Sequence, residues 1–405
     1  MRSKYEIAMK EKMLITLERD RVVGILSAMP IPGMEEAAAQ TAESDQKREK
    51  SKTKAPDTAN TTYLQQTHPP AAHPQATPSV SSGASLKVDT PFPVDSRVNP
   101  QLDIPTKSNL VNRLSTIRVT TTHEAHDMPV SWIDFHPNKH LICTASDDRT
   151  WQVINVTDGE CQMSGSGHSD WLSAAKFSPS GNLLATSSGD RSVRIWDLND
   201  EDCVADFDDH TQASWGVAWH TCGSFVASCS MDATSKIWDL GSERCRNTLR
   251  GHQSSVMSVQ FVYGSSTMLT SSSDKTLKLW DARTGLCHHT YFSHKHPVNY
   301  ASISSAGDTI ASVDSIGILN LWDVRVGQVH TEVNLNGCAH HVTFDPSGEV
   351  IAVALESGAM ELIEIATVRR TQFLEHAASV NCIQFDFEGG QIASCSADGT
   401  VKIWN

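Results

Sequence analysis

The chain has 405 residues and a formal net charge of −14 at pH 7. The acidic excess lies in residues 111–405, which hold 19 Lys and Arg against 34 Asp and Glu, whereas residues 1–110 are nearly neutral at 14 against 13. An acidic region repels phosphate backbones, and no apolar run approaches the roughly 18 residues of a membrane span. With no secretory signal at the N-terminus, these features argue against nucleic-acid and membrane partners and predict a cytoplasmic protein.

The first predicted element in chain order is a helix at residues 4–28, within an N-terminal segment, 1–29. It contains no proline, and its apolar residues recur among interleaved charges at Ile7, Leu14, Leu17 and Val22. Arg21 stands where the apolar seam of a coiled coil would continue. The segment is therefore interpreted either as a coiled-coil remnant or as an amphipathic helix that folds only against a partner.

Residues 30–110 are rich in Pro, Ser, Thr and Ala and poor in large apolar side chains. Such a composition cannot bury enough surface to offset the entropy of ordering, so we predict a disordered linker. Within it a basic run comprises Lys47, Arg48, Lys50, Lys52 and Lys54. This N-terminal basic run could contact an acidic polymer such as a microtubule surface, although a solvated charge run is the alternative.

A repeated pattern then begins, in which His is followed after 22 residues by Asp and after six more by Trp-Asp. The pattern recurs at a period of 42 residues in His168/Asp190/Trp196-Asp197, His210/Asp232/Trp238-Asp239 and His252/Asp274/Trp280-Asp281. A period of about 40 to 45 residues that ends in Trp-Asp is typical of WD40 repeats, each of which forms one four-stranded blade of a β-propeller.

Four further copies are less complete. The fifth has His294 and Trp322-Asp323, but Ile316 occupies the Asp position. The first lacks Trp-Asp, the sixth has lost the whole pattern, and the seventh is nearly complete; their leading positions are His126, Leu335 and His376. We predict an all-β fold, a seven-bladed WD40 propeller over residues 111–405, preceded by a short helix and a disordered linker.

A Ser or Thr also recurs four residues before the Asp, so that most blades hold a set of four polar residues. A Ser/His/Asp combination suggests a hydrolase, but an enzyme needs one such site, whereas one set per blade describes a structural hydrogen-bond network. We therefore predict no catalytic residues, no cofactor and no enzyme activity. The predicted tetrads are His168, Thr186, Asp190 and Trp196; His210, Ser228, Asp232 and Trp238; His252, Thr270, Asp274 and Trp280; and His376, Ser394, Asp398 and Trp404.

All ten cysteines lie in the repeat region. Four of them are 42 residues apart, at equivalent outer-strand positions of successive blades: Cys161, Cys203, Cys245 and Cys287. Equivalent positions on neighbouring blades are too far apart for a disulfide, so we predict free thiols in a reducing compartment. No Cys or His cluster has metal-ligand spacing, and no metal site is predicted.

Ring closure is predicted from the β-prone run at residues 114–121, LSTIRVTT. The last blade ends in sequence after its third strand, so this early run is expected to supply the fourth. Hydrogen bonding between the two ends would remove an exposed sheet edge.

Partners of propellers bind mostly over the rim where turns between blades converge. The rim positions lie three and five residues after each His and one residue before each Asp, and the candidates are Trp171, Trp215, Met231, Met257, Ser131, Asp147, Asn299, His340 and Asn381. Trp171 and Trp215 are not required by the repeat, so they predict an exposed apolar binding patch. The alternative is that they pack under a loop; Trp132, Trp151 and Trp219 are predicted core residues.

The amino-acid sequence of individual blades resembles that of the WD-repeat proteins of the axonemal central apparatus over roughly residues 120–405. The resemblance is carried by TASDDRTWQVINV, GHSDWLSAAKFSPSG, LRGHQSSVMSV, SSSDKTLKLWDARTGLCHHTYFSH and the degenerate sixth copy. It implies a protein-binding scaffold of the cilium and flagellum cytoskeleton, with central-pair components as partners. The alternative is a general WD40 adaptor, such as a ubiquitin-ligase substrate receptor or a signalling scaffold.

Overall fold

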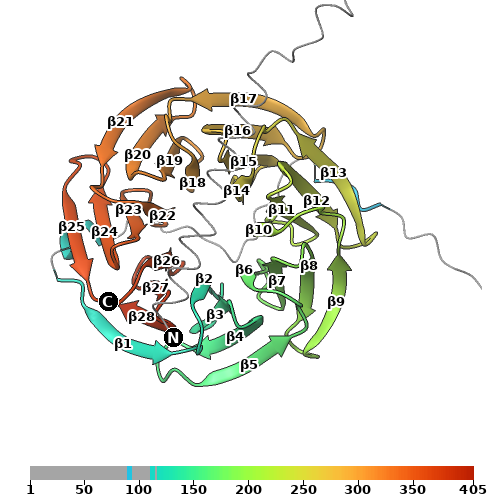
Figure 1. Ribbon diagram of the computed structural model, residues 1–405, viewed down its shortest axis with the longest axis horizontal. Helices are drawn as coiled ribbons and strands as arrows, with labels where there is room; N and C mark the ends of the chain where they lie inside the picture. The colour runs from blue at the N-terminus through green and yellow to red at the C-terminus, as the bar shows by residue number, and fades with distance from the viewer. Residues whose placement is uncertain (1–88, 94–109, 115) are drawn as a thin grey trace, which may run out of the picture. The chain divides into compact units, whose positions relative to one another are not determined.

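The computed structural model describes residues 89–93, 110–114 and 116–405. Within this part, seven antiparallel sheets of four strands follow one another around a ring (Figure 1). The predicted seven-bladed propeller is therefore confirmed. The predicted helix at residues 4–28 and the basic run at residues 47–54 lie outside the described residues.

Each blade runs from an inner strand at the ring centre to an outer strand at its edge (Figure 1). Blades one to three comprise β2 Val130–Phe135, β3 Leu141–Ser146, β4 Thr150–Asn155, β5 Cys161–Ser166; β6 Leu172–Phe177, β7 Leu183–Ser188, β8 Val193–Asp197, β9 Asp202–Phe207; and β10 Ser214–Trp219, β11 Phe225–Ser230, β12 Thr234–Asp239, β13 Arg244–Arg250.

Blades four to six comprise β14 Val256–Phe261, β15 Thr267–Ser272, β16 Thr276–Asp281, β17 Leu286–Phe292; β18 Val298–Ile303, β19 Thr309–Asp314, β20 Ile318–Asp323, β21 Gln328–Asn334; and β22 Ala339–Phe344, β23 Val350–Leu355, β24 Ala359–Glu364, β25 Arg370–Leu374. Blade seven comprises β26 Val380–Phe385, β27 Ile392–Ser396, β28 Thr400–Trp404 and β1 Val119–Glu124, and a single helical turn, α3 Leu110–Arg113, precedes β1.

Burial explains why each blade has this order. The second strands are buried on both faces between neighbouring blades, as in β11 and β23, where every residue is buried. Outer strands such as β25 alternate between exposed and half-buried residues, which is the pattern of a sheet edge that meets water. The predicted core tryptophans Trp132, Trp151 and Trp219 are all buried.

The ring closes where β1 pairs with β28 in antiparallel register, Val119 opposite Trp404 and Glu124 opposite Thr400. This confirms the predicted closure but moves its strand from 114–121 to Val119–Glu124. The reason is packing: Leu114 and Ile117 are buried with blades six and seven instead of pairing in the sheet.

The predicted tetrad positions of blade two lie in hydrogen-bonding contact. His168 Nδ1 lies 2.9 Å from Asp190 Oδ2, and His168 Nε2 lies 2.8 Å from Thr186 Oγ1. The Trp196 indole N–H donates to the same hydroxyl at 2.9 Å. The set ties the turn between the second and third strands to the entry of the inner strand.

Blades three, four and seven repeat this arrangement around one shared hydroxyl each. The hydroxyl oxygen lies 2.7, 2.8 and 2.8 Å from the His Nε2 in these three blades, and it accepts from the Trp indole N–H at 2.8, 2.8 and 2.9 Å. The residues are His210, Ser228 and Trp238; His252, Thr270 and Trp280; and His376, Ser394 and Trp404. The carboxylates at 2.9, 2.8 and 3.5 Å from the His Nδ1 are those of Asp232, Asp274 and Asp398.

The turn carboxylates of these sets are held ionised. Burial raises the pKa of Asp190, but hydrogen bonds from His168 and Ser192 outweigh burial and hold that pKa well below its usual value. The same balance lowers the pKa of Asp148 in blade one to about 2. A carboxylate that accepts several hydrogen bonds is stabilised in its charged form.

In blade five the structure corrects the expectation, based on Ile316, that the tetrad lacks its carboxylate. Ile316, at the Asp position, is exposed, and Asp314 takes the carboxylate role instead, with Oδ2 at 3.2 Å from His294 Nδ1. His294 also contacts Ser312, which accepts from Trp322 at 2.8 Å. Blade five therefore keeps a complete tetrad whose Asp comes two residues earlier.

Candidate protein-interaction surface

Each inner strand carries a β-bulge between its first and third residues, and the bulged residue is the rim position five residues after the His. The register slips there in all seven blades: Ser131, Ser173, Trp215, Met257, Asn299, His340 and Asn381. An extra residue in one strand bends the strand and re-aims its side chain. The repeat therefore places one re-aimed side chain per blade on this rim.

In four blades the re-aimed side chain bridges to the next blade. Ser131 Oγ donates to Leu172 O at 2.6 Å, and Ser173 Oγ donates to Ser214 O at 2.8 Å. Asn299 and Asn381 donate their side-chain amides to the carbonyls of Ala339 and Val130, both at 2.8 Å. These contacts assign Ser131, Asn299 and Asn381 to blade-to-blade attachment, which the repeat spacing alone did not reveal.

A backbone hydrogen bond fixes the other two rim positions in every blade. The residue before the Asp position donates its N–H to the carbonyl of the residue three after the His. The pairs are Asp147 to Pro129, Gly189 to Trp171, Met231 to Ala213, Ser273 to Ser255, Ser315 to Pro297, Glu356 to Cys338 and Ala397 to Ser379. The rim backbone is thus the same in all blades, and differences between blades lie in the side chains.

The shared hydroxyls and indoles of the four predicted tetrads do not contribute to the surface of this rim. The hydroxyl residues are fully buried at 0% exposed, and the tryptophans are at most 5% exposed. They are Thr186, Ser228, Thr270 and Ser394, with Trp196, Trp238, Trp280 and Trp404. A partner that docks on the folded propeller cannot reach these atoms, so the tetrads stand as internal attachments and the interaction candidates are the rim side chains.

Trp171 and Trp215 lie together on adjacent blades. Their ring centroids are 5.0 Å apart with planes at 33°, a tilted stacking geometry favourable for aromatic pairs. Trp171 also covers Gly189, where a Cβ would come within 2.6 Å of the indole. Both tryptophans are half-buried, so each ring covers part of the other and keeps part of its surface exposed; their role in binding stays a prediction.

Two neighbouring rim methionines, Met231 and Met257, are also half-buried. At their bulges Trp215 and Met257 carry apolar side chains where Ser131 and Ser173 carry bridging hydroxyls. The Trp215 indole N–H is buried without a hydrogen-bond partner in the described part of the chain. An unpaired donor is costly in a packed interior. At the bulge, blades three and four therefore differ from the four blades whose bulged side chain bridges to the next blade.

The remaining candidates, Asp147 and His340, are half-buried on blades one and six. Burial lowers the pKa of His340, against the attraction of Glu356, which raises it. His340 is thereby biased towards its neutral form. Asp147 lies on blade one, next to the blade that carries Trp171, whereas His340 lies on blade six.

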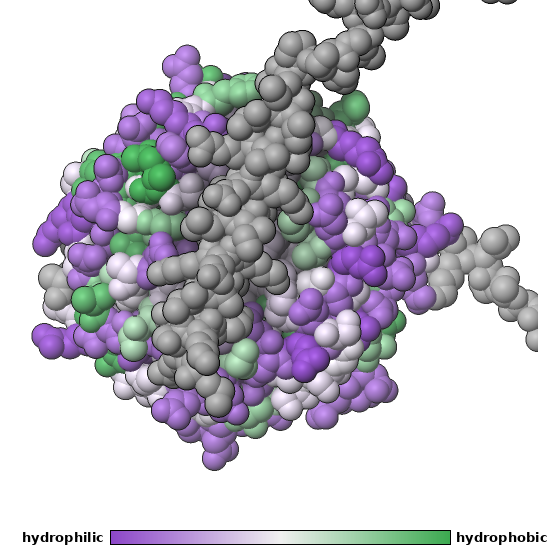
Figure 2. All heavy atoms as spheres, in the orientation of Figure 1, coloured by the Kyte–Doolittle hydropathy of each residue, from purple (hydrophilic) through white to green (hydrophobic). Residues whose placement is uncertain are grey.

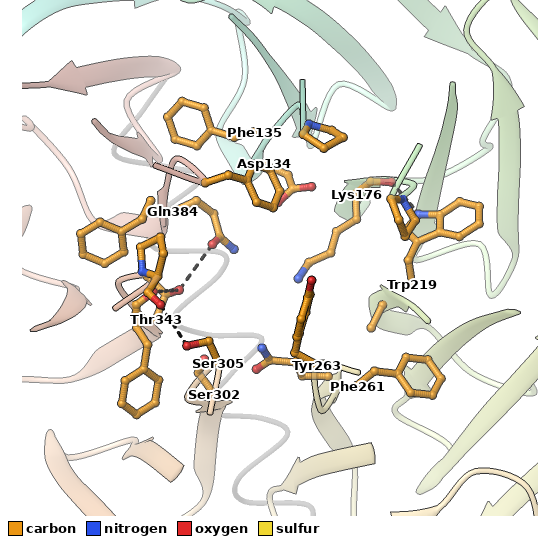
Figure 3. Close-up of a pocket in the computed structure, with 18 of the residues that line it drawn as sticks. Asp134, Phe135, Lys176, Trp219, Phe261, Tyr263, Ser302, Ser305, Thr343 and Gln384 are labelled. Carbon is orange, nitrogen blue, oxygen red and sulfur yellow. Dashed lines mark hydrogen bonds between the residues drawn. The ribbon is translucent and has the colours of Figure 1, made fainter. Parts of the chain in front are cut away.

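The opposite ends of the inner strands surround a cavity of about 320 Å³ at the ring centre. In Figure 3 the side chains of Lys176 and Gln384 point into this cavity. Burial raises the pKa of Asp134 to about 7, against the opposing attraction of Lys176. The cavity residues recur at the 42-residue spacing on successive inner strands, so the repeat could have located them: Asp134, Lys176, Ala218, Gln260 and Ser302.

Deeper in the ring, aromatic side chains from non-neighbouring blades meet. Trp132 of blade one lies 5.8 Å from Tyr300 of blade five and 5.2 Å from His341 of blade six. Tyr300 and His341 are 4.1 Å apart. Sequence reasoning placed Trp132 in the core but missed this cluster, because its contacts cross the ring.

Among the described residues, no group of three or more His, Cys, Asp or Glu side chains is arranged to hold a metal ion. No helix in that part of the chain is long and apolar enough to cross a membrane. The four periodic cysteines lie on outer strands β5, β9, β13 and β17.

A family model described as WD domain, G-beta repeat, matches the chain at residues 117–155, 159–197, 201–239, 243–281 and 367–405. The chain carries WD40 repeats. The matched ranges do not include the first three strands of blades five and six, where the Asp position is Ile316 or the whole pattern is lost. WD40 propellers generally bind other proteins and act as non-enzymatic scaffolds.

Curated relatives of these WD40 repeats include the sperm-associated antigen 16 proteins of Mus musculus, 36% identical over 191 residues, and of Homo sapiens, 36% identical over 183 residues. The flagellar WD repeat-containing protein Pf20 of Chlamydomonas reinhardtii is 34% identical over 183 residues. The matches cover 42 to 43% of this chain and 27 to 29% of each relative. The matched part thus spans less than a third of each relative's length.

The propeller surface in Figure 2 is mostly hydrophilic, with hydrophobic residues in small, separate groups. No large apolar face is visible in that view. A mainly polar surface with local apolar groups is typical of interfaces that depend on a few anchoring side chains.

Proposed function

We propose that this protein is a non-enzymatic interaction scaffold of the ciliary and flagellar axoneme, within the central apparatus that supports microtubule-based motility. Its similarity to a flagellar WD-repeat protein and to the sperm-associated antigen 16 proteins supports this assignment. The partners are other axonemal proteins, bound over the propeller rim.

The observation that carries the rim assignment is the change at the bulges of blades three and four. Ser131, Asn299 and Asn381 use the bulged side chain to attach one blade to the next. Trp215 and Met257 occupy the same position with apolar side chains, and Trp171 stacks on Trp215. Half-buried aromatic side chains held in a fixed geometry are the kind that anchor protein interfaces.

The two parts of the chain differ in charge: residues 47–54 are mainly basic, whereas residues 111–405 are acidic. Tubulin tails are acidic, and residues 111–405 carry net negative charge, so electrostatic repulsion disfavours binding of the propeller to a microtubule. We assign direct microtubule contact to the basic run that includes Lys47 and Lys54.

The rim is tested by affinity capture of axonemal proteins with purified Trp171→Ala and Trp215→Ala variants. We expect at least about tenfold weaker capture, because an interface aromatic anchor contributes about 2 kcal/mol or more. Phe387→Ala is the control, since Phe387 is an exposed aromatic residue after β26, at the opposite ends of the strands. Wild-type capture by both tryptophan variants would contradict the rim assignment.

The cellular assignment is tested by stepwise salt extraction of isolated axonemes and immunodetection of the chain. Retention with the central pair after peripheral proteins are removed is the expected result. A purely soluble pool in non-ciliated cells would instead support the general WD40 adaptor.

A further inference from the structure

Residues Asp89–Pro93, in the stretch that composition predicts to be a disordered linker, lie against blade three at the end opposite the rim (the short cyan segment near β13 in Figure 1). Phe92 is the anchor of this segment, with only 8% of its surface exposed. The linker prediction is therefore wrong for these five residues. The Phe92 side chain, in an otherwise polar stretch, is buried in a pocket of blade three.

The pocket around Phe92 is aromatic. Its ring stacks on Phe225, with centroids 4.3 Å apart and planes at 18°, and meets the edge of His220 at 5.2 Å. The Arg246 guanidinium lies 5.5 Å from the Phe92 ring and 5.3 Å from the Phe225 ring. Burial lowers the pKa of His220 to about 4, so this ring is neutral at pH 7 and packs as an aromatic edge.

Polar contacts hold the backbone of the segment on both sides of the anchor. The Thr90 N–H donates to Asp239 Oδ2 at 2.8 Å, and the Arg246 guanidinium donates to the Thr90 carbonyl. Ser266 Oγ of blade four donates to the Pro93 carbonyl at 3.5 Å. Asp239 has a side chain only 1% exposed, so its bond to Thr90 is a buried, charge-assisted one.

The residues that form this pocket differ from those of the neighbouring blades. Arg244 also contacts the segment, pairing with Asp89 at 3.2 Å. At the positions of Phe225, Arg244 and Arg246, blade two has Leu183, Asp202 and Val204, and blade four has Thr267, Leu286 and His288. The propeller fold does not require an aromatic residue and two arginines at these positions. Their coincidence in one blade, around one docked segment, indicates recognition.

We propose that blade three, with the adjoining edge of blade four, forms a docking groove for a short peptide, and that its ligand is the chain's own Asp-Thr-Pro-Phe-Pro segment, residues 89–93. Each proline restricts its own backbone and biases the residue before it, Thr90 or Phe92, to an extended conformation. The segment therefore loses little conformational entropy when it docks.

The groove lies at the turns that follow β10 and β12, whereas the rim lies at the turns that precede the inner strands. Docking in cis places residues 89–93 at the end of blade three opposite the rim, so this segment does not cover the tryptophan pair. This inference does not rest on the axonemal assignment, and the two can fail separately.

The groove is tested on the full chain by the binding of a labelled synthetic peptide that contains Asp-Thr-Pro-Phe-Pro. Phe92→Ala weakens the cis anchor and empties the groove, so we expect the peptide to bind this variant at least tenfold more tightly than the wild-type chain. A peptide with Ala in place of its Phe should bind the same variant at least tenfold more weakly. Equal, weak binding of the first peptide to both proteins would overturn the proposal.

The side of the groove is tested in the Phe92→Ala background. Adding Arg246→Ala should weaken peptide binding at least tenfold, whereas adding Arg250→Ala, an exposed arginine at the other end of β13, should leave it unchanged. Sedimentation tests the assignment in cis. A concentration-dependent dimer of the wild-type chain that Phe92→Ala converts to a monomer would overturn it, because the segment would then occupy a second copy.

Discussion

Blades two and six have the same strand order but hold their strands with different chemistry. Blade two has the His168, Thr186, Asp190 and Trp196 network, whereas blade six has apolar side chains at three of these positions, Leu335, Val353 and Ile363, all at most 2% exposed. A buried polar set is stable when every member is paired, and an apolar set avoids the need for pairing. The comparison indicates that a stable blade has either a complete polar tetrad or apolar residues at the tetrad positions.

Blade six also contains a polar pair of its own. Glu361, on the third strand, accepts two short hydrogen bonds from Arg370 Nη2, at 2.7 and 3.0 Å. The Glu361 side chain is 5% exposed and that of Arg370 is 30% exposed. This pair ties the third strand to the outer strand, so the loss of the tetrad does not leave the blade without polar attachment.

The largest expected effect is that of Thr186→Val in blade two. It removes the hydroxyl shared by His168 and Trp196, both buried, and leaves two polar groups without a partner. We expect a loss of about 3 kcal/mol of unfolding free energy, since each unsatisfied buried group costs about 1 to 3 kcal/mol. Urea denaturation measures it, with exposed Thr211→Val as the control; equal midpoints for both variants would contradict the network's role.

Asp190→Asn should cost about 1.5 to 3 kcal/mol at pH 7, the range for a hydrogen bond to a charged group. The folded-state pKa of Asp190 lies below the usual value of an aspartate carboxyl, so its stabilisation is complete above about pH 4 and disappears as pH falls through the folded pKa. Denaturation at a series of pH values therefore checks whether the difference between Asp190→Asn and wild type shrinks below pH 4. A difference independent of pH would show that the charge is not involved.

The reverse change, Val353→Thr, tests whether an isolated tetrad member harms the apolar blade. The new hydroxyl would be fully buried without its His and Trp partners. Because it can still donate weakly to a carbonyl of the paired strand, as Thr186 does to Arg194 O at 3.5 Å, we expect the lower end of the penalty, about 1 kcal/mol. Thermal unfolding measures it, with Val353→Ile as an apolar control; a stabilised Thr variant would refute the requirement for a complete set.

The 42-residue period was sufficient to predict seven blades and four of the tetrads, because these features depend on residues at fixed separations. The closing strand, expected from a β-prone run, begins five residues later than predicted, and the carboxylate of blade five lies two residues before the repeat position. The period could not predict the cluster of Trp132, Tyr300 and His341, since those contacts cross the ring. Nor could composition show that Phe92 docks, because a composition averaged over a polar segment hides one anchoring residue. The inter-blade role of Asn381 depends on a bulge, which changes side-chain direction without changing sequence spacing.

The smallest expected effect on stability is that of a substitution at Ile316 in blade five. The strict repeat places an Asp at this position, so it predicts that the tetrad of blade five lacks a carboxylate. Asp314 already supplies one to His294, and Ile316 is 51% exposed. Ile316→Asp should therefore change the unfolding free energy by no more than about 0.5 kcal/mol, as expected for a surface substitution. Asp314→Asn is the matched comparison and should destabilise the blade in the same way as Asp190→Asn. If Ile316→Asp stabilised the protein strongly and removed the effect of Asp314→Asn, a carboxylate at the repeat position would be the natural partner of His294. We expect the opposite result, because the turn already brings the Asp314 carboxylate to His294 Nδ1.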